Sequence, residues 1–562
     1  MQGHRRHWVL AGILIVAALA RLPGLEAVPP PLNQDEASRG YDAWAILETG
    51  ADRHGQRWPL FLESFGPGDY TAALSTYITV PFVAILGPTT AAMRLPDALL
   101  GVLTVLMLFV WLERQTDARV ALLASAVLAL SPWHIALTRT AHESGYAPFF
   151  LAVAMAGLHR SGLISDDAED WRRGGRAARA WAMAAGLALG AHAWVYPATR
   201  LFTPLFLVAI AFIYRRRLLS MVGAGGARVT LGWGLAGLLI GCLPLLVTMF
   251  SHPEYLAARA RAALLFAKQG TALQMAVTLA ANYASNLDPR YLFLNSDDMS
   301  GILIEGVGQQ LLVVAPFALI GLIRVIVGVE RQAWSRLLAA WLILYPVPAA
   351  ICADWNPHPM RTVGGMILFP ILAATGIDWT VSQGRRLGRA LKWVAGGAAV
   401  AAVLANTVQF GRAYYGNFRL LSRAGYQAGL VEAVRQAAAL GDDADFILVT
   451  NRCNQAYVYA LLYQPIDPKT LATTPQAVAG GRLGFHQVLR IGKYYFVPKE
   501  NPEAVRRFQD EWSQVPCGAE GLVIDVVERG AAMSGQPLGR FPAGDPRVAG
   551  DMLELRRWRK SE

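Results

Sequence analysis

Charged residues are scarce in this chain of 562 residues. Asp, Glu, Lys and Arg make up 16% of it, against about a quarter in a typical soluble domain. Hydrophobic residues make up 54%, and the mean hydropathy is +0.33. Many apolar runs approach the ~20 residues that cross the hydrocarbon core of a bilayer. A soluble protein would have to bury all of these runs, so the composition indicates an integral membrane protein.

Cysteine is also rare, and no pair has the CxxC or cysteine–histidine spacing that is typical of metal sites. Cys453 and Cys517 both lie near the C-terminus. Two interpretations stay open for them: a disulfide, if this region faces an oxidising compartment, or two unpaired thiols. The chain shows no internal repeat and no low-complexity tract.

Acidic residues are outnumbered by basic ones, which gives a formal net charge of +11. In a soluble chain this charge would suggest a nucleic-acid partner. Here the arginines cluster between apolar runs, as the positive-inside rule requires of cytoplasmic loops. We therefore expect no nucleic-acid partner and a multi-pass location in the cytoplasmic (inner) membrane. Residues 1–25 also fit a signal peptide, but the many later runs favour an uncleaved first helix.

Apolar segments recur along the first 410 residues, and we expect about eleven transmembrane helices. The segments lie at roughly 7–25, 90–112, 118–138, 144–160, 180–197, 200–214, 229–250, 307–328, 337–353, 362–381 and 391–408. With the N-terminus inside, most arginine clusters between spans face the cytoplasm. The connections 26–89, 139–143, 251–306 and 354–361 then lie outside, as does the chain after about residue 410.

The composition changes near residue 410, so we expect a transmembrane catalytic domain over 1–409 and an extracytoplasmic soluble α/β domain over 410–562. Strand-like runs lie at 443–451, 456–463, 493–497 and 521–528, and a helix is expected at 429–440. In the first outer loop, the stretches 36–47 and 69–83 are amphipathic. We expect juxtamembrane helices there, with ordinary loop helices as the alternative.

Ionisable residues gather at the outer ends of the predicted spans. They are Asp35 and Glu36 after the first span, Asp69 and Tyr70 late in the first loop, Arg94 at the start of the second span, Arg139, His142 and Glu143 between the third and fourth spans, and His358 and Arg361 before the tenth span. Charge near hydrocarbon is costly, so it tends to mark a functional site. All of these residues lie on the same predicted face, which favours one site.

The chemistry of this set is that of group transfer. Adjacent carboxylates such as Asp35 and Glu36 repel each other, so one can have a raised pKa and act as a general base. Arginine offers a planar fork of donors to phosphate oxygens. A base beside a phosphate clamp indicates transfer from a phosphate-linked donor, which within a bilayer would be a lipid phosphate.

Each residue of the set also has a structural interpretation. An Asp-Glu pair is commonly found where a helix is capped and begins. Arg94 and Arg139 could extend to lipid head groups, and His358, between two prolines, could shape a turn.

Five longer fragments carry a resemblance to a known family. They are NQDEASRGYDAWAILETGADRHGQRWPLFLESFGPGDY at 33–70, GPTTAAMRLPDALLG at 87–101, SPWHIALTRTAHESG at 131–145, EGVGQQLLVVAPFALIGL at 305–322 and NPHPMRTVGGMILFPILAATGI at 356–377. In order and spacing they resemble the bacterial GT-C-fold glycosyltransferases of family 39 type, which are related to protein O-mannosyltransferases and to the aminoarabinose transferase of lipid A.

The resemblance implies a GT-C fold and an inverting transfer of one sugar from a polyprenyl-phosphate donor to a hydroxyl of a lipid, glycan or protein acceptor. It makes Asp35 the general base, supported by Glu36. It also implies that Arg94 holds the acidic loop or the donor phosphate, and that Arg361, with His358, contacts that phosphate.

Two stretches depart from the family pattern. GDYTAALSTY, at 68–77, lacks the lysine that relatives often have, and Asp297 and Asp298 stand where relatives often have an Arg-His pair. Some relatives bind a divalent metal ion near the acids. Asp35 is therefore a candidate metal ligand, although no compact ligand set is present in the sequence.

Two other classes of protein share some of these features. A secondary transporter also has many spans and intramembrane charges, but it usually has charges near the midplane and repeated halves. A membrane-anchored receptor would leave the clustered acids and arginines unexplained.

Overall fold

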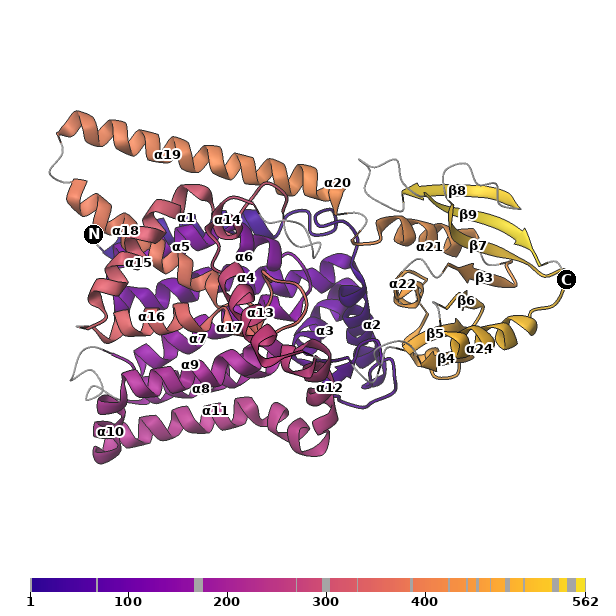
Figure 1. Ribbon diagram of the computed structural model, residues 1–562, viewed down its shortest axis with the longest axis horizontal. Helices are drawn as coiled ribbons and strands as arrows, with labels where there is room; N and C mark the ends of the chain where they lie inside the picture. The colour runs from indigo at the N-terminus through magenta and orange to yellow at the C-terminus, as the bar shows by residue number, and fades with distance from the viewer. Residues whose placement is uncertain are drawn as a thin grey trace. The chain divides into compact units, whose positions relative to one another are not determined.

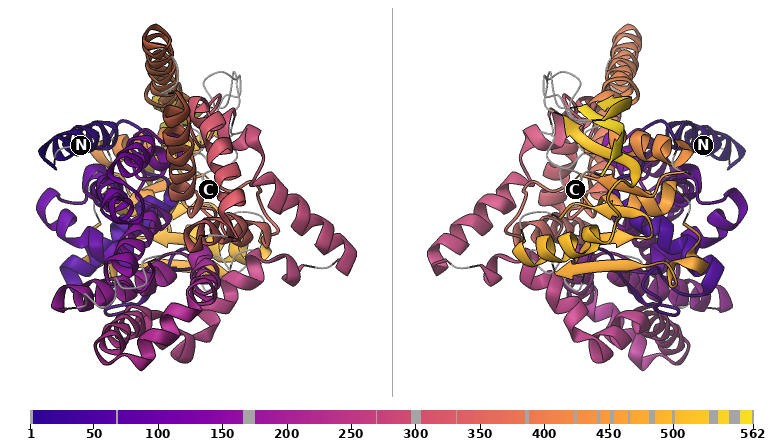
Figure 2. Two further views of the ribbon diagram at one scale, coloured as in Figure 1. Left: turned by 90° about the vertical axis from the view of Figure 1, so that its left-hand side faces the viewer. Right: turned by 90° about the vertical axis from the view of Figure 1, so that its right-hand side faces the viewer.

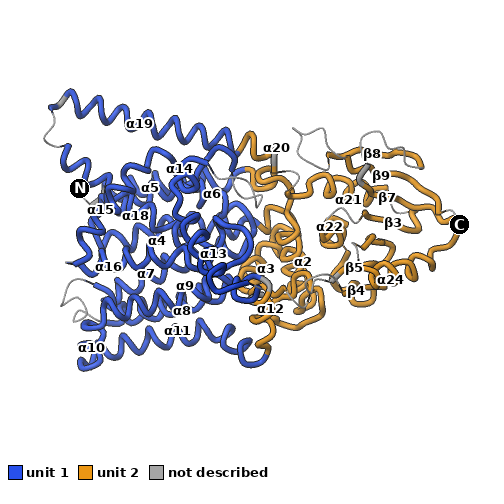
Figure 3. The backbone as a smooth tube through the Cα atoms, in the orientation of Figure 1, with its two compact units in different colours: residues 1–23, 94–251, 263–414 blue, residues 24–93, 252–262, 415–562 orange. Residues whose placement is uncertain are grey.

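The computed structural model divides into two compact units (Figure 3). It describes residues 3–66, 69–165, 175–268, 270–295, 304–330, 332–384, 388–422, 425–440, 443–450, 454–464, 466–480, 486–498, 501–527, 535–542 and 552–560. Unit 1 comprises 1–23, 94–251 and 263–414, and unit 2 comprises 24–93, 252–262 and 415–562. Unit 2 thus joins the first outer loop to the C-terminal region. The predicted domain boundary after residue 409 stays a prediction.

Unit 1 is built of helices (Figure 1). They are α1 (Gly3–Arg21), α4 (Thr90–Gln115, whose first residues belong to unit 2), α5 (Ala118–Ala129), α6 (Pro132–Leu137), α7 (Ala147–Arg160), α8 (Arg176–Val195), α9 (Pro197–Ile213), α10 (Arg215–Gly223), α11 (Gly225–Ser251), α13 (Ala272–Ser285), α14 (Pro289–Phe293), α15 (Ala315–Gly328), α16 (Ala333–Leu344), α17 (Val347–Ala350), α18 (Gly365–Gly384) and α19 (Arg389–Gly411), with short 3₁₀ turns η1 (Glu143–Tyr146), η3 (Leu265–Ala267) and η4 (Leu312–Val314). Each predicted apolar segment overlaps at least one of these helices.

Four helical segments within the described residues are long and apolar enough to cross a membrane. They are Thr90–Gln115, Gly225–Ser251, Gly365–Gly384 and Ala390–Phe418. The predicted number of about eleven spans is not confirmed by this criterion, which requires at least 18 residues in one helix. Several apolar helices are shorter than that, such as α5 with 12 residues and α15 with 14.

Glycines bring some helices of unit 1 into direct backbone contact. A Cβ atom added to Gly186 of α8 would collide with the carbonyl oxygen of Gly234 in α11, and one added to Gly190 would collide with the backbone at Gly241. Small residues at such positions let membrane helices pack closely. The pair α8 and α11, which lie side by side in Figure 1, is therefore held at a fixed spacing by its sequence.

Unit 2 combines short helices with a seven-stranded sheet (Figure 2). Its elements are α2 (Gln34–Thr49), β1 (Phe61–Glu63), β2 (Tyr70–Ala72), α3 (Leu74–Leu86), α12 (Pro253–Ala263), α20 (Arg419–Leu421), α21 (Ala428–Leu440), β3 (Phe446–Val449), α22 (Ala456–Tyr463), α23 (Pro468–Leu471), β4 (Gln476–Gly480), β5 (His486–Ile491), β6 (Tyr494–Phe496), α24 (Pro502–Ser513), β7 (Glu520–Val527), β8 (Gln536–Pro542) and β9 (Met552–Arg559). The strand order is β4-β5-β6-β3-β7-β9-β8, with β3 parallel to β6 and β7.

Helices cover both faces of this sheet. Phe446 and Trp558 pack against Trp512 of α24 on one face. A Cβ on Gly429 of α21 would lie 3.4 Å from Leu553, whose side chain points to the face opposite Trp558 because side chains alternate along β9. The C-terminal region therefore has the layered α/β architecture that the sequence predicts.

Two predicted elements of unit 2 were wrong. The run 456–463, expected to be a strand, is helix α22. Seven of its eight residues are buried, so no polar face was left to reveal the helical period. The stretch 69–83, expected to be one helix, begins as strand β2, which pairs with β1 before α3 starts. The stretch 36–47 lies within α2, as predicted.

Arg53 fixes the loop that follows α2. Its guanidinium donates to Asp42 at 2.8 Å, to Ser38 and to the carbonyls of Glu63 and Ser64. Side-chain exposure is 2% for Arg53 and 1% for Asp42. The pair therefore ties α2 to β1 from inside the protein.

Replacing Arg53 with alanine is expected to cost about 3–5 kcal/mol of unfolding free energy, because it leaves a buried carboxylate unpaired. Chemical denaturation in detergent measures this loss. The matched control is Arg507→Ala, which removes an exposed ion pair with Glu503 in the same unit and should cost under about 1 kcal/mol. Equal losses would contradict a structural role for the buried pair.

Candidate functional site

Asp35 and Glu36 lie in the first turn of α2. Asn33 caps this helix, and its side chain accepts a hydrogen bond from the Glu36 amide at 2.9 Å. In return, Oε2 of Glu36 accepts from the Asn33 amide at 2.9 Å, so the two residues form a capping box. Glu36 is fully buried, whereas Asp35 is only partly buried. The structural interpretation thus holds for Glu36, and Asp35 is the more accessible acid.

A tyrosine from the C-terminal region lies within electrostatic range of both acids. Within unit 2, α2 packs against α22 and α23. Burial raises the pKa of Tyr459 in α22 well above its ordinary value, and the charges of Tyr463, Asp35 and Glu36 add to this effect. A hydrogen bond from Gln427 acts in the opposite direction and lowers the pKa. Tyr459 therefore keeps its proton and can donate a hydrogen bond near Asp35. Sequence reasoning missed this residue, because it lies more than 400 positions away.

Asp69 and Tyr70 lie beside the hairpin of β1 and β2. The carbonyl of Asp69 accepts from the Ser64 amide at 2.8 Å. The Tyr70 ring stacks on the Tyr255 ring with 3.7 Å between centroids, and the His252 ring also stacks on Tyr255, at 4.8 Å. Burial, with the charge of Glu63, raises the pKa of Tyr70 to about 12. These residues form an aromatic stack in unit 2, and their predicted substrate contact stays a prediction.

In unit 1, Arg139 is bound to backbone carbonyls. Its Nη1 donates to the carbonyls of Arg21 and Pro23 at 2.8 and 2.9 Å, and its guanidinium lies 5.8 Å from the ring centre of Tyr414. Arg139 is fully buried, as is Arg94 in α4. These contacts give Arg139 a role in the fold, and its predicted role at the substrate stays a prediction.

His142 and Glu143 form the start of turn η1. Nδ1 of His142 lies 2.8 Å from the Ser144 hydroxyl and 3.8 Å from Oε2 of Glu143. The His142 ring also meets the Tyr196 ring edge-on at 5.8 Å. A Cβ on Gly145 would lie 2.7 Å from Oδ1 of Asp97. This turn is therefore closely packed on the helix that carries Arg94.

Arg361 holds a carboxylate in its fork. Nη1 and Nη2 bind the two oxygens of Asp354 at 2.5 and 2.7 Å, and side-chain exposure is 11% for Arg361 and 46% for Asp354. Burial alone would lower the pKa of Arg361, but Asp354 and Tyr196 raise it above its ordinary value. Burial alone would raise the pKa of Asp354, but Arg361 holds it below its usual range. The pair therefore stays ionised at neutral pH.

Amide side chains position the loop that carries Arg361. Oδ1 of Asn286 accepts from the His358 amide at 3.0 Å, and its Nδ2 donates to Asn356 at 2.8 Å. Asn282 donates to the carbonyl of Cys352 at 2.9 Å. The His358 ring itself is buried and stacks on Trp355. The fold thus holds the loop 354–361 rigidly around Arg361.

Tyr196 connects two parts of the predicted set. Its ring meets His142, and its charge interacts with Arg361. Unit 1 therefore brings His142, Glu143 and Arg361 to one region, while Asp35, Glu36, Asp69 and Tyr70 belong to unit 2. Sequence reasoning missed Tyr196, because this residue lies in a very short connection between two apolar runs. The signal available for it was its position directly before Pro197.

Four further residues singled out in the sequence are Asp297, Asp298, Cys453 and Cys517. Asp297, Asp298 and Cys453 lie outside the described residues. Cys517 is an exposed free thiol. Within the described ranges, no three His, Cys, Asp or Glu side chains gather as a metal site would require. The role of Asp35 as a metal ligand therefore stays a prediction.

Comparisons with known proteins agree with this fold. The family model of dolichyl-phosphate-mannose-protein mannosyltransferases matches residues 68–242. No curated protein sequence matches the chain. The structure of ArnT from Cupriavidus metallidurans bound to undecaprenyl phosphate is similar with a TM-score of 0.58 and 12% identity, covering 99% of this chain and 98% of ArnT.

A second enzyme has a similar structure. It is the oligosaccharyltransferase of Archaeoglobus fulgidus in its apo form, with a TM-score of 0.55 and 10% identity, covering 93% of this chain and 70% of that one. At such identities the likeness shows the fold. The family model matches part of this chain, and the chain shares its fold with these two membrane proteins.

Proposed function

We propose that the protein transfers a single sugar from a polyprenyl-phosphate donor to an acceptor hydroxyl on the outer face of the cytoplasmic membrane, with inversion at the sugar. The observation that carries this proposal is the largely buried fork of Arg361, which already binds two oxygens of one anion. A phosphate presents oxygens to arginine in the same bidentate way. ArnT, which shares the fold, was solved with undecaprenyl phosphate bound, and this supports a polyprenyl phosphate as the donor class.

In the proposed reaction, Asp35 removes the proton from the acceptor hydroxyl as its oxygen attacks the anomeric carbon of the sugar. The bond from that carbon to the phosphate oxygen breaks, and its electron pair leaves with the lipid phosphate. The phosphate gains one negative charge in this step, because a diester becomes a monoester. Arg361 therefore binds the transition state and the product more strongly than the donor, which is how a charged group accelerates a reaction.

Other residues have supporting roles in this proposal. Glu36 holds the first turn of α2, so that Asp35 keeps a fixed position. Tyr459 donates a hydrogen bond near the base. Arg94 and His358 remain our candidates for the donor phosphate, and Asp69, Tyr70, His142 and Glu143 for the sugar or acceptor. Arg139 acts through the fold, on the evidence of its backbone contacts.

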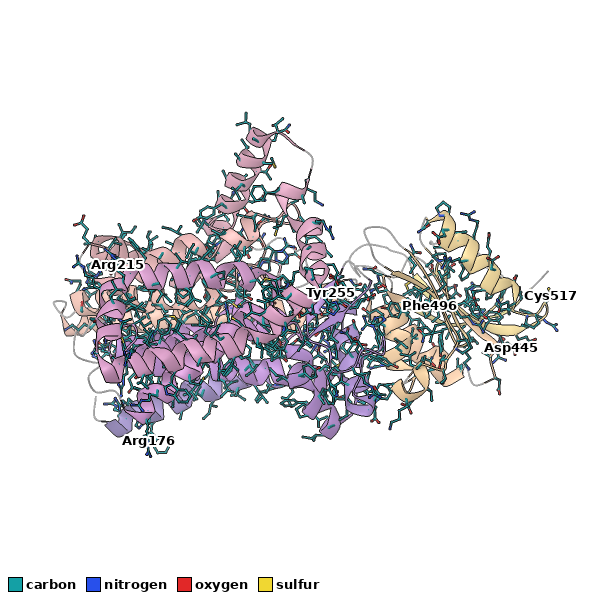
Figure 4. The ribbon with its side chains drawn as sticks, turned by 90° about the horizontal axis from the view of Figure 1, so that it is seen from below. Arg176, Arg215, Tyr255, Asp445, Phe496 and Cys517 are labelled. Carbon is teal, nitrogen blue, oxygen red and sulfur yellow. The ribbon has the colours of Figure 1, made fainter. Side chains whose placement is uncertain are left out.

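The outer location of the reaction is part of the proposal. Arg176 and Arg215 lie at the same end of unit 1 (Figure 4). Positively charged helix ends of this kind face the cytoplasm. His142 and Arg361 both interact with Tyr196, which directly follows α8 at the end opposite to Arg176, and this supports an extracytoplasmic site.

The test is incubation of the purified protein with a panel of radiolabelled polyprenyl-phosphate sugars and membrane extract as the acceptor source. We expect one donor to be consumed with release of lipid monophosphate. If no donor is consumed while the protein moves sugars or ions across liposome membranes, the transporter interpretation replaces this one.

Asp354 should compete with the donor phosphate for Arg361. Replacing Asp354 with asparagine removes the competing charge, so we expect the Kd for undecaprenyl phosphate to fall by about tenfold, the effect of one charge-assisted hydrogen bond. Equilibrium binding of the labelled lipid to purified protein measures this. The matched control is Asp288→Asn, which breaks an exposed pair with Arg290 in the same unit and should change nothing. Weaker lipid binding by the Asp354 variant would show that the carboxylate only supports the arginine.

A further inference from the structure

A groove at the arginine-rich end of unit 1 lies between α8 and α11. It encloses about 480 Å³ and is lined by Arg176, Arg179, Ala180, Met183, Ala184, Leu187 and Trp233. Two of these residues carry positive charge and the others are apolar. The groove therefore combines a cationic mouth with a hydrocarbon wall.

The two arginines at the mouth are available for an anion. Within the part of the chain that the structure describes, neither forms an ion pair, and Nε of Arg179 is buried without a hydrogen-bond partner. A buried N–H group without a partner is costly, so this position favours a ligand that accepts a hydrogen bond. Arg176 and Arg179 are three residues apart and thus lie on the same face of α8. The first turn of α8 also contains no acid.

The wall of the groove has the length and the chemistry of a lipid chain. From Arg176 to Leu187, helix α8 rises about 16 Å, close to half of the ~30 Å hydrocarbon thickness of a bilayer. Leu187 and Trp233 are 38% and 46% exposed, so both present hydrocarbon surface outward. The glycine contacts between α8 and α11 set the spacing of the two helices, and the groove is therefore formed before any ligand binds.

We propose that this groove binds one anionic phospholipid, with its phosphate on Arg176 and Arg179 and one acyl chain along Met183, Leu187 and Trp233. Charge complementarity selects this occupant, because a zwitterionic head group would bring a cation to the same two arginines. Basic pockets between membrane helices bind anionic head groups in this manner. The site lies at the start of α8, whereas Arg361 interacts with Tyr196 beyond the end of that helix. The site therefore takes no part in sugar transfer.

The test is native mass spectrometry of the full-length protein in detergent with added phosphatidylglycerol or phosphatidylcholine. We expect the protein to retain phosphatidylglycerol, and the double variant Arg176→Gln, Arg179→Gln to bind it about thirtyfold more weakly, at about 1 kcal/mol for each basic residue. The control variant Arg215→Gln, Arg216→Gln removes two arginines from the same end of unit 1 that do not line the groove. It should retain wild-type binding.

A second variant tests the chain-binding wall. Trp233→Ala should weaken phosphatidylglycerol and phosphatidylcholine by the same factor, because it removes contact with the acyl chain alone. Equal retention of the two lipids by the wild-type protein would overturn the proposal, and so would unchanged phosphatidylglycerol binding in the Arg176, Arg179 variant. Sugar transfer is not measured in this test, so its outcome is independent of the proposed activity.

Discussion

Replacing Asp35 with asparagine is expected to lower kcat for sugar transfer by about 10²–10⁴-fold, the usual contribution of a general base. Asparagine has nearly the same size as aspartate but cannot take the acceptor proton. Because Asp35 is not the capping partner of Asn33, the helix start should persist, and so should expression. Steady-state kinetics with the identified donor measure the loss.

The neighbouring acid supplies the control for this variant. Glu36→Gln keeps a side chain that can still accept the hydrogen bond from Asn33, so we expect near-normal stability and a much smaller loss of kcat. Full activity in the Asp35 variant, or a larger loss in the Glu36 variant, would remove the base assignment from Asp35.

The second large effect is expected at Arg361. Replacing it with alanine removes a bidentate positive group that stabilises the charge developing on the lipid phosphate as this phosphate leaves. We therefore expect kcat/KM to fall by about 10²–10³-fold. Binding of undecaprenyl phosphate should weaken as well. Arg361→Lys should recover only part of the loss, because lysine is a point charge and cannot bind two oxygens in one plane.

Arg290→Ala is the control for Arg361, since Arg290 also forms a bidentate pair with an aspartate, but is exposed. It should leave kcat/KM unchanged. If Arg361→Ala binds the lipid and turns over normally, Arg361 is not the phosphate contact, and His358 or Arg94 becomes the next candidate.

Much of the fold follows from patterns that are local in the sequence. Each apolar run that predicted a helix contains one, because an apolar surface must be buried or face lipid. The Asn33–Glu36 capping box is also local, and the structural interpretation of the acid pair anticipated it in part. The helix at 456–463 was misread as a strand, because aromatic and apolar residues fill its whole circumference.

The candidate site was harder to predict, because its partners come from distant segments. Tyr41 donates to the carbonyl of Ile466, 425 residues away, in the contact that brings α22 to α2. No periodicity in the sequence indicates that Tyr459 comes within electrostatic range of Asp35. Asp354 lies in the same short loop as Arg361, yet its bidentate pairing depends on a loop shape that Asn286 and Asn282 impose. Sequence patterns thus identified charged positions, and the structure identified their partners.

We propose above all that this protein breaks the bond between a sugar and a polyprenyl phosphate. The most direct measurement is the release of polyprenyl monophosphate from a labelled polyprenyl-phosphate sugar, with wild-type protein and the Asp35→Asn variant side by side. We predict release by the wild type that depends on an acceptor, and almost none by the variant. Equal release by both proteins, or no release from any donor by the wild type, would contradict the claim.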